Sequence, residues 1–146
     1  MDGRAFLDVA RELAAGSSEP RWRSSVGRAY HALLHEVLRT LQLRGFSLPP
    51  RDKVHTFARP KLVYATDPDL ERIGLTLEAL GRLRNAADYQ LSTAGPFLSA
   101  RIAASALADS EAAILLVDAI EADPAHRQAA VGSPPHEHSE GEWRRQ

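Results

Sequence analysis

The chain has 146 residues, of which 44% are hydrophobic and 25% charged, and its formal net charge at pH 7 is -1. This length allows one domain with a buried core, and the composition is ordinary for a globular protein. The near-zero net charge excludes a global field that attracts nucleic acid, and the absence of cysteine excludes disulfides and thiolate metal sites. No run approaches the ~20 apolar residues of a membrane span, and the first residues show no signal-peptide pattern, so we expect a cytoplasmic protein with no membrane partner.

The first half of the chain predicts three helices. Apolar residues recur at helical spacing over residues 6–14 and again over residues 21–43. Gly45 closes the second of these helices, and the proline pair that follows prevents its continuation. A third, weaker helix over residues 51–64 contains Pro60, which we expect to kink it or to split it in two.

The second half predicts two longer helices and a tail. Residues 67–69 form a typical helix start, with an acidic N-cap and a proline in the first turn, and a helix over residues 70–91 follows. A last helix over residues 97–122 carries small residues on one face, which suits close helix packing. We therefore expect an all-α fold, a compact bundle of about five helices over residues 1–123, followed by a flexible, disordered tail over residues 124–146.

One polar side chain interrupts the apolar face of the helix over residues 70–91. Apolar positions three or four residues apart form that face, namely Leu70, Ile73, Leu77, Leu80, Ala87 and Leu91. Arg84 falls in the same row, where a guanidinium is costly unless it is paired or opens onto a cleft. Asp88 follows four residues later on the same side of the helix. Two interpretations stay open: a local ion pair between Arg84 and Asp88, or a polar cleft lined by Arg84, Asn85, Asp88 and Tyr89.

A second polar row lies on the helix over residues 21–43. Its members, three or four residues apart, are Arg28, His31, His35 and Arg39. The spacing of His31 and His35 can place two nitrogens on one metal, but the sequence HALLH lacks the glutamate of the zinc-protease motif, so we expect no metal site. The glycines form no dinucleotide or phosphate-loop motif, and we expect no cofactor.

The two polar rows meet in one cleft if their helices pack side by side. Arginine and asparagine would then grip a phosphate or a base, histidine would exchange a proton near neutral pH, and tyrosine would stack or donate a hydrogen bond. The alternative is a buried polar network that fixes the register of the helices. The candidate ligand-binding residues are Arg28, His31, His35, Arg84, Asn85, Asp88 and Tyr89.

These residues resemble the two motifs of HEPN domains, a family of helical nucleotide-binding domains. The segment SSVGRAYHALLHEVLRTL resembles the long-helix motif, usually of the form SRAYYAxFH, and matches it at Arg28, Ala29, Tyr30, Ala32 and His35. It departs from that motif at Gly27, where serine is common, and at His31, where a second aromatic residue is common. The segment LGRLRNAADYQL resembles the second motif, and the matching residues are Arg84, Asn85, Ala87, Asp88 and Tyr89. The resemblance covers residues 1–122.

The resemblance implies an all-α bundle that forms a homodimer, with the polar motif at or near the subunit cleft. Many HEPN proteins are metal-independent ribonucleases, often toxins with a small nucleotidyltransferase as partner, and others are silent binding or scaffold modules. In the nuclease members four to six residues separate the motif arginine from a histidine. The corresponding residues here are Tyr89, Gln90 and Leu91.

We therefore expect a HEPN-like nucleotide- or RNA-associated binding module that is dimeric and lacks the standard nuclease histidine. The first alternative is a metal-independent ribonuclease toxin with a variant site, in which Arg84 and His35 would be catalytic because both match the motif positions. The second alternative is a pure protein-interaction module, in which Arg84 and Asp88 only pin the interface.

Overall fold

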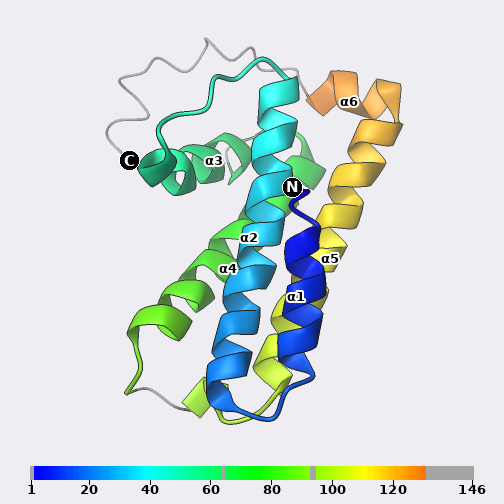
Figure 1. Ribbon diagram of the computed structural model, residues 1–146. Coiled ribbons are helices and arrows are strands. Elements are labelled where there is room, and N and C mark those ends of the chain that lie inside the picture. Colours follow the sequence, from blue (N-terminus) through cyan, green and yellow to red (C-terminus); the bar gives the residue numbers. More distant parts are fainter. Residues whose placement is uncertain (1, 64, 93–94, 131–146) are drawn as a thin grey trace.

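The structure is a computed structural model that describes residues 2–63, 65–92 and 95–130. Within those residues the chain forms helices, turns and loops and no strand, which confirms the expected all-α bundle. The α-helices are α1 (Ala5–Ala14), α2 (Glu19–Leu43), α3 (Val54–Val63), α4 (Pro68–Tyr89), α5 (Arg101–Ala122) and α6 (Pro124–Ala130). Short 3-10 turns, η1 (Arg51–Lys53) and η2 (Gly95–Phe97), precede α3 and α5. Figure 1 shows α1, α2 and α5 lying along one another, with α4 slanting behind α2 and α3 packed crosswise on α4.

The centre of the bundle is α2, which contacts α1, α3, α4 and α5 and is buried along most of its length. Two buried serines fix neighbouring helices to it. The hydroxyl of Ser25 donates a hydrogen bond to the carbonyl oxygen of Ala10 on α1 (2.7 Å). The hydroxyl of Ser110 on α5 donates to the carbonyl oxygen of Ala29 on α2 (2.8 Å). Each bond links a serine side chain of one helix to a backbone carbonyl of its neighbour, and the small side chains allow the helices to approach closely.

The small face predicted for the last helix is buried in α5. Its buried small residues are Ala103, Ala106, Ser110 and Ala113. They let α5 pack on both α2 and α4, as the sequence pattern indicates. None of the described helices, α5 included, offers an apolar stretch long enough to cross a membrane.

The apolar face predicted for α4 is buried except at its last position. The buried residues are Leu70, Ile73, Leu77, Leu80 and Ala87. The prediction that Leu91 belongs to this face was wrong, because α4 ends at Tyr89 and Leu91 is 69% exposed. The predicted start of this helix is confirmed, since Oδ2 of Asp67 accepts a hydrogen bond from the backbone N–H of Leu70 (3.0 Å).

The helix α3 lies unusually close to α4. It runs unbroken through Pro60, so the expected split does not occur. A methyl group at Gly74 of α4 would lie 2.7 Å from Cβ of Leu62 and 2.8 Å from the backbone nitrogen of Val63. The missing side chain at Gly74 therefore allows the backbones of α3 and α4 to touch.

A buried arginine joins α2 to the end of α4. Nη1 of Arg23 donates hydrogen bonds to the carbonyl oxygens of Ala87 (2.9 Å) and Ala86 (3.2 Å), and the guanidinium pairs with Glu19 (2.9 Å). The guanidinium also lies 4.2 Å from the centre of the Phe97 ring. The last carbonyl groups of a helix lack partners within the helix, so Arg23 caps α4 and balances the negative end of its dipole.

The structure corrects the boundary between domain and tail. Residues 124–130, predicted to belong to a disordered tail, form α6, whose first backbone N–H groups bond to Oδ1 of Asp123. Nη1 of Arg44 donates to the carbonyl oxygen of Arg127 (3.1 Å), which ties α6 to the end of α2. An acidic cap followed by proline starts this helix, but its lack of apolar periodicity concealed it. The rest of the predicted tail, residues 131–146, lies outside the described residues.

Replacing Arg23 by alanine should lower the free energy of unfolding by about 2–4 kcal/mol, because the carbonyl groups of Ala86 and Ala87 and the carboxylate of Glu19 lose a buried partner. Urea or thermal unfolding measures the change. Arg21→Ala, at an exposed position of the same helix, is the matched control and should change stability by less than about 0.5 kcal/mol. Equal effects of the two substitutions would show that Arg23 contributes no more than a surface arginine.

Candidate ligand-binding site

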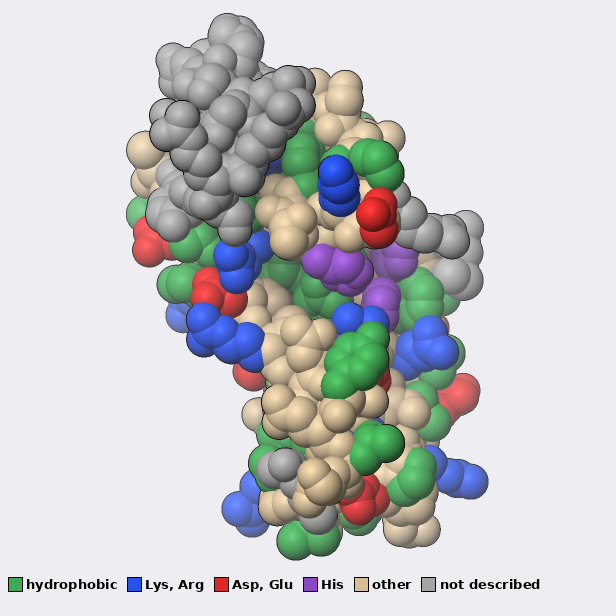
Figure 2. Space-filling view, turned by 90° about the vertical axis from the view of Figure 1, so that its left-hand side faces the viewer, with side chains coloured by type: hydrophobic (Ala, Val, Ile, Leu, Met, Phe, Trp, Pro, Cys, Tyr) green, Lys and Arg blue, Asp and Glu red, His purple; other side chains and the backbone are tan. Residues whose placement is uncertain are grey.

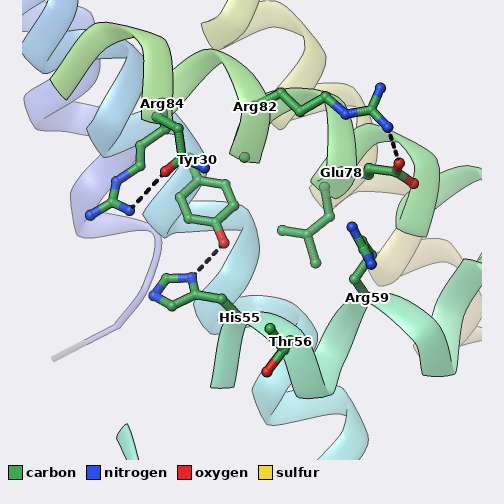
Figure 3. Close-up of a pocket in the computed structure, with 10 residues that line it drawn as sticks. Tyr30, His55, Thr56, Arg59, Glu78, Arg82 and Arg84 are labelled. Carbon is green, nitrogen blue, oxygen red and sulfur yellow. Dashed lines mark hydrogen bonds and ion pairs between the residues drawn. The ribbon is translucent and has the colours of Figure 1, made fainter. Parts of the chain in front are cut away.

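An open pocket of about 210 Å³ lies between α2, α3 and α4 (Figure 3). Its walls come from Tyr30 of α2, from residues 55–59 of α3 and from residues 77–85 of α4. The lining residues are Tyr30, His55, Thr56, Arg59, Leu77, Glu78, Gly81, Arg82, Arg84 and Asn85. The ring of Tyr30 lies against Gly81, where a methyl carbon would be only 3.4 Å from Cε2 of the ring. The backbone of α4 therefore forms the floor beneath Tyr30.

A hydrogen bond joins Tyr30 to His55 across the pocket wall. The hydroxyl oxygen of Tyr30 lies 2.6 Å from Nδ1 of His55. The two rings are also nearly parallel, with centroids 5.6 Å apart and an interplanar angle of 16°. Tyr30 is buried, so this contact supplies the partner that a buried phenol needs.

Burial and nearby charge set the protonation of this pair. Burial raises the pKa of the Tyr30 hydroxyl, and the positive charge of Arg84 opposes that shift. Burial lowers the pKa of His55, and Arg84 and His31 lower it further. Near neutral pH the pair is therefore a protonated phenol beside a neutral imidazole, and we assign the hydroxyl as donor and Nδ1 as acceptor. The imidazole hydrogen is then on Nε2, which makes Nε2 a hydrogen-bond donor.

The guanidinium of Arg84 is held by residues of its own helix. Its Nε lies 2.9 Å from Oδ2 of Asp88, and Nη1 donates a long hydrogen bond of 3.4 Å to Oδ1 of Asn85. Its Cζ lies 5.9 Å from the centre of the Tyr89 ring. Buried Nε has no hydrogen-bond partner among the described residues, so the contact with Asp88 is an ion pair in which the N–H does not point at the oxygen. The expected local ion pair is present, and Arg84 is at the same time part of the pocket wall.

The histidine row of α2 packs on Phe6 of α1. The ring of His35 stacks on that of Phe6, with centroids 5.2 Å apart and an interplanar angle of 3°. The centre of the His31 ring lies 6.1 Å from that of Phe6 and 6.3 Å from that of His55. Cζ of Arg28 lies 5.7 Å from the centre of the Phe6 ring. Figure 2 shows histidines gathered on one face of the molecule, with basic side chains close by. His31 therefore joins the Phe6 contacts to the pocket.

The pocket is electropositive although the whole chain is nearly neutral. Three arginines line it, namely Arg59, Arg82 and Arg84, and Glu78 is the only acidic residue among its lining residues. Arg82 forms an ion pair with Glu78 and Arg84 forms one with Asp88, so among the described residues Arg59 is the lining guanidinium without a carboxylate partner. An anion with several acceptor oxygens, such as a phosphate, suits this set of donors.

The structure divides the seven residues that the sequence singled out. Those that line the pocket or lie against it are His31, Arg84 and Asn85. Those on its exposed rim, in contact with Arg84, are Asp88 and Tyr89. Those packed on Phe6 and outside the pocket lining are Arg28 and His35. The two polar rows thus meet chiefly through His31.

His55 was not among the site residues predicted from the sequence. This histidine lies on the weakly patterned helix α3, and its partner Tyr30 is 25 residues away on another helix. Tyr30 itself matched the HEPN motif, and its helical spacing predicted burial, but nothing in the sequence indicated the partner of its hydroxyl. Only the packing of α3 across α4 and α2 reveals the pair.

Replacing Arg84 by alanine should raise the pKa of His55, because a positive charge that disfavours the imidazolium is removed. An NMR titration of the imidazole hydrogens measures this pKa in both proteins. Arg82→Ala is the matched control, since the charge of Arg82 is already balanced by its ion pair with Glu78. A His55 pKa that is the same in wild type and Arg84→Ala would contradict the proximity of the two groups.

No protein-family model, no curated protein and no solved structure matches this chain, so the case for a ligand rests on the pocket itself.

Proposed function

We propose that this chain is a HEPN-like nucleotide- or RNA-binding module that holds a phosphate group between Arg84 and His55. The observation that supports this most directly is the presence, in one electropositive pocket, of a partly buried guanidinium and a neutral imidazole whose Nε2 is assigned as a donor. Figure 3 shows Arg84 and His55 on the same side of the Tyr30 ring, with Arg59, Glu78 and Arg82 on the other. Phosphate oxygens accept hydrogen bonds from both kinds of group.

The size of the pocket favours one part of a ligand over a whole small molecule. Its volume of about 210 Å³ is below the ~300–1,000 Å³ that is typical of pockets enclosing a whole small ligand. A phosphate and its sugar would therefore occupy the pocket, and the bases would lie along the rim. The Tyr89 ring, 73% exposed on that rim, offers a surface on which a base can stack. These features favour a single-stranded RNA over a compact metabolite.

The HEPN resemblance adds a homodimer to this proposal. Exposed apolar side chains follow one another at the end of α4 and after it, namely Tyr89, Leu91 and Leu98. Exposed apolar groups of this kind are common where proteins associate. A second copy on this surface would extend the rim of the pocket, and a small nucleotidyltransferase is the other partner that the resemblance implies.

A metal-independent ribonuclease is the second candidate, and His55 is the observation that favours it. Such an enzyme needs a group that accepts the proton of the 2′-hydroxyl and a group that protonates the leaving oxygen. His35, which matches the HEPN motif, stacks on Phe6 and does not line the pocket. His55 lines the pocket together with Arg84, so it replaces His35 as the catalytic candidate for this alternative.

Arg84→Ala should weaken the binding of a short fluorescent single-stranded RNA at least ~10-fold, because the phosphate loses charge-assisted hydrogen bonds worth about 1.5–3 kcal/mol. Fluorescence anisotropy at one fixed, low salt concentration measures the Kd. Arg72→Ala is the matched control: Arg72 is an exposed arginine of the same helix that lines a separate groove between α4 and α5. An equal loss in the two variants, or no RNA binding by the wild type at all, would contradict the proposal and favour a pure protein-interaction module.

We expect no robust cleavage of a mixed RNA substrate in EDTA, because the histidine that usually follows the motif arginine is missing. A gel assay with purified protein measures this. If the second candidate is right, the wild type cleaves the RNA, His55→Ala abolishes cleavage in a folded protein, and His35→Ala does not. Cleavage that depends on His35 instead would show that the geometry of the pocket does not identify the acting residue.

A further inference from the structure

A second cluster of polar side chains lies where the N-terminus of α4 meets α6, and it shares no residue with the lining of the pocket. Nε2 of His126 lies 3.2 Å from Oδ1 of Asp67 and 3.1 Å from Oδ2 of Asp69. In the part of the chain that the structure describes, this is the one group of three metal-binding side chains whose ligand atoms all lie within 4.8 Å of one another. His126 is 59 residues from Asp67 in the chain, so the fold brings the group together.

An ion pair alone leaves this cluster incompletely satisfied. Nε2 of an imidazole carries at most one hydrogen, and only its contact with Asp67 has the geometry of a hydrogen bond. The other oxygen of Asp67 already accepts the backbone N–H of Leu70 as the N-cap of α4 (3.0 Å). Carboxylate oxygens of Asp67 and Asp69 lie within 4.8 Å of each other, and Nε2 of His126 has no second hydrogen for Asp69, so the two like charges repel.

A divalent cation at this point would satisfy all three side chains. Zinc binds imidazole nitrogens and carboxylate oxygens at about 2.0–2.2 Å, so neighbouring ligands of one tetrahedral ion lie roughly 3.3–3.5 Å apart. The two N···O separations, 3.2 Å and 3.1 Å, are slightly shorter, so small outward shifts of the side chains would admit the ion. A set that includes an imidazole favours zinc over magnesium and calcium, which prefer oxygen ligands.

We propose that Asp67, Asp69 and His126 bind one Zn²⁺ ion, which fastens α6 to the N-terminus of α4. Solvent would complete the coordination, since the His126 and Asp69 side chains are 25% and 37% exposed. The positive end of the α4 dipole opposes a cation at this place, so we expect a lower affinity than the same three ligands would give away from a helix N-terminus. This site is independent of the phosphate pocket. No metal site was predicted from the sequence, because spacing along the chain reveals only ligands that are close together in it, and His126 is 59 residues from Asp67.

Titration of Zn²⁺ into the full chain by calorimetry should show one binding event that depends on these three residues. His126→Gln and Asp69→Asn should each weaken it at least about 10-fold. Asp67→Asn should weaken it as well while keeping an oxygen that caps α4, so this variant separates the loss of a ligand from the loss of the helix cap. Circular dichroism of each variant shows that it is folded. Co²⁺ in place of Zn²⁺ should give visible absorption bands that His126→Gln abolishes.

The chain itself offers a matched control, because His136 and His138 near the C-terminus are further potential zinc ligands. The double variant His136→Ala/His138→Ala should keep the affinity of the wild type. Loss of binding in that double variant together with wild-type affinity in His126→Gln would overturn the proposal. Wild-type Zn²⁺ affinity in Asp69→Asn, or no preference for Zn²⁺ over millimolar Mg²⁺, would overturn it too.

Discussion

The position of the α4 C-terminus depends on the guanidinium of Arg23. A helix leaves its last carbonyl groups without partners, and water satisfies them only where the helix end is exposed. Here the end of α4 is pressed against α2, and Arg23 supplies the donors from within the interface. Its charge is tolerated in that buried place because Glu19 and the carbonyl oxygens surround it. Arg84 and Asn85 lie in the turn just before these carbonyls, so the same contact holds them beside α2.

The other end of this interface carries Tyr30. It follows Arg23 by seven residues, which is about two helical turns, so both side chains lie on the face of α2 that meets α4. One buried side chain therefore anchors α4, and the other supplies the floor contact and the hydroxyl of the pocket. The burial that keeps Tyr30 protonated also keeps His55 neutral. The positive charge of the pocket consequently comes from its arginines, while the imidazole contributes a directional donor.

The sequence predicted those features that one helix displays by itself. The apolar row of α4 and the anomaly of Arg84 within it are visible at helical spacing, and the ion pair with Asp88 needs only the next turn. Asp67 was recognised as a cap because its hydrogen bond is local. The bundle architecture follows from the same periodicity, since each apolar face requires another helix to cover it.

Features that depend on which helices face each other were not predictable in this way. Arg23 looked like one of several polar residues near the start of α2, and its partners are 63 and 64 residues away. His55 gained its role from α3 crossing α4. The helix α6 has no apolar period of its own, and contacts with Arg44 and Asp67 hold it. In each case the physical reason is a long-range partner whose identity no local pattern encodes.

The close approach at Gly74 has a consequence for how the pocket can change. The backbone of α3 rests directly on α4 at that point, with Val63 and Leu62 where a side chain would otherwise stand. His55 lies in the first turn of α3, and its hydrogen bond to Tyr30 requires α3 to keep its present distance from α4. The distance between the rings of Tyr30 and His55 therefore depends on Gly74, which contacts neither ring. A methyl group at Gly74 would push α3 away from α4 and so change the width of the pocket, without altering any residue that lines it.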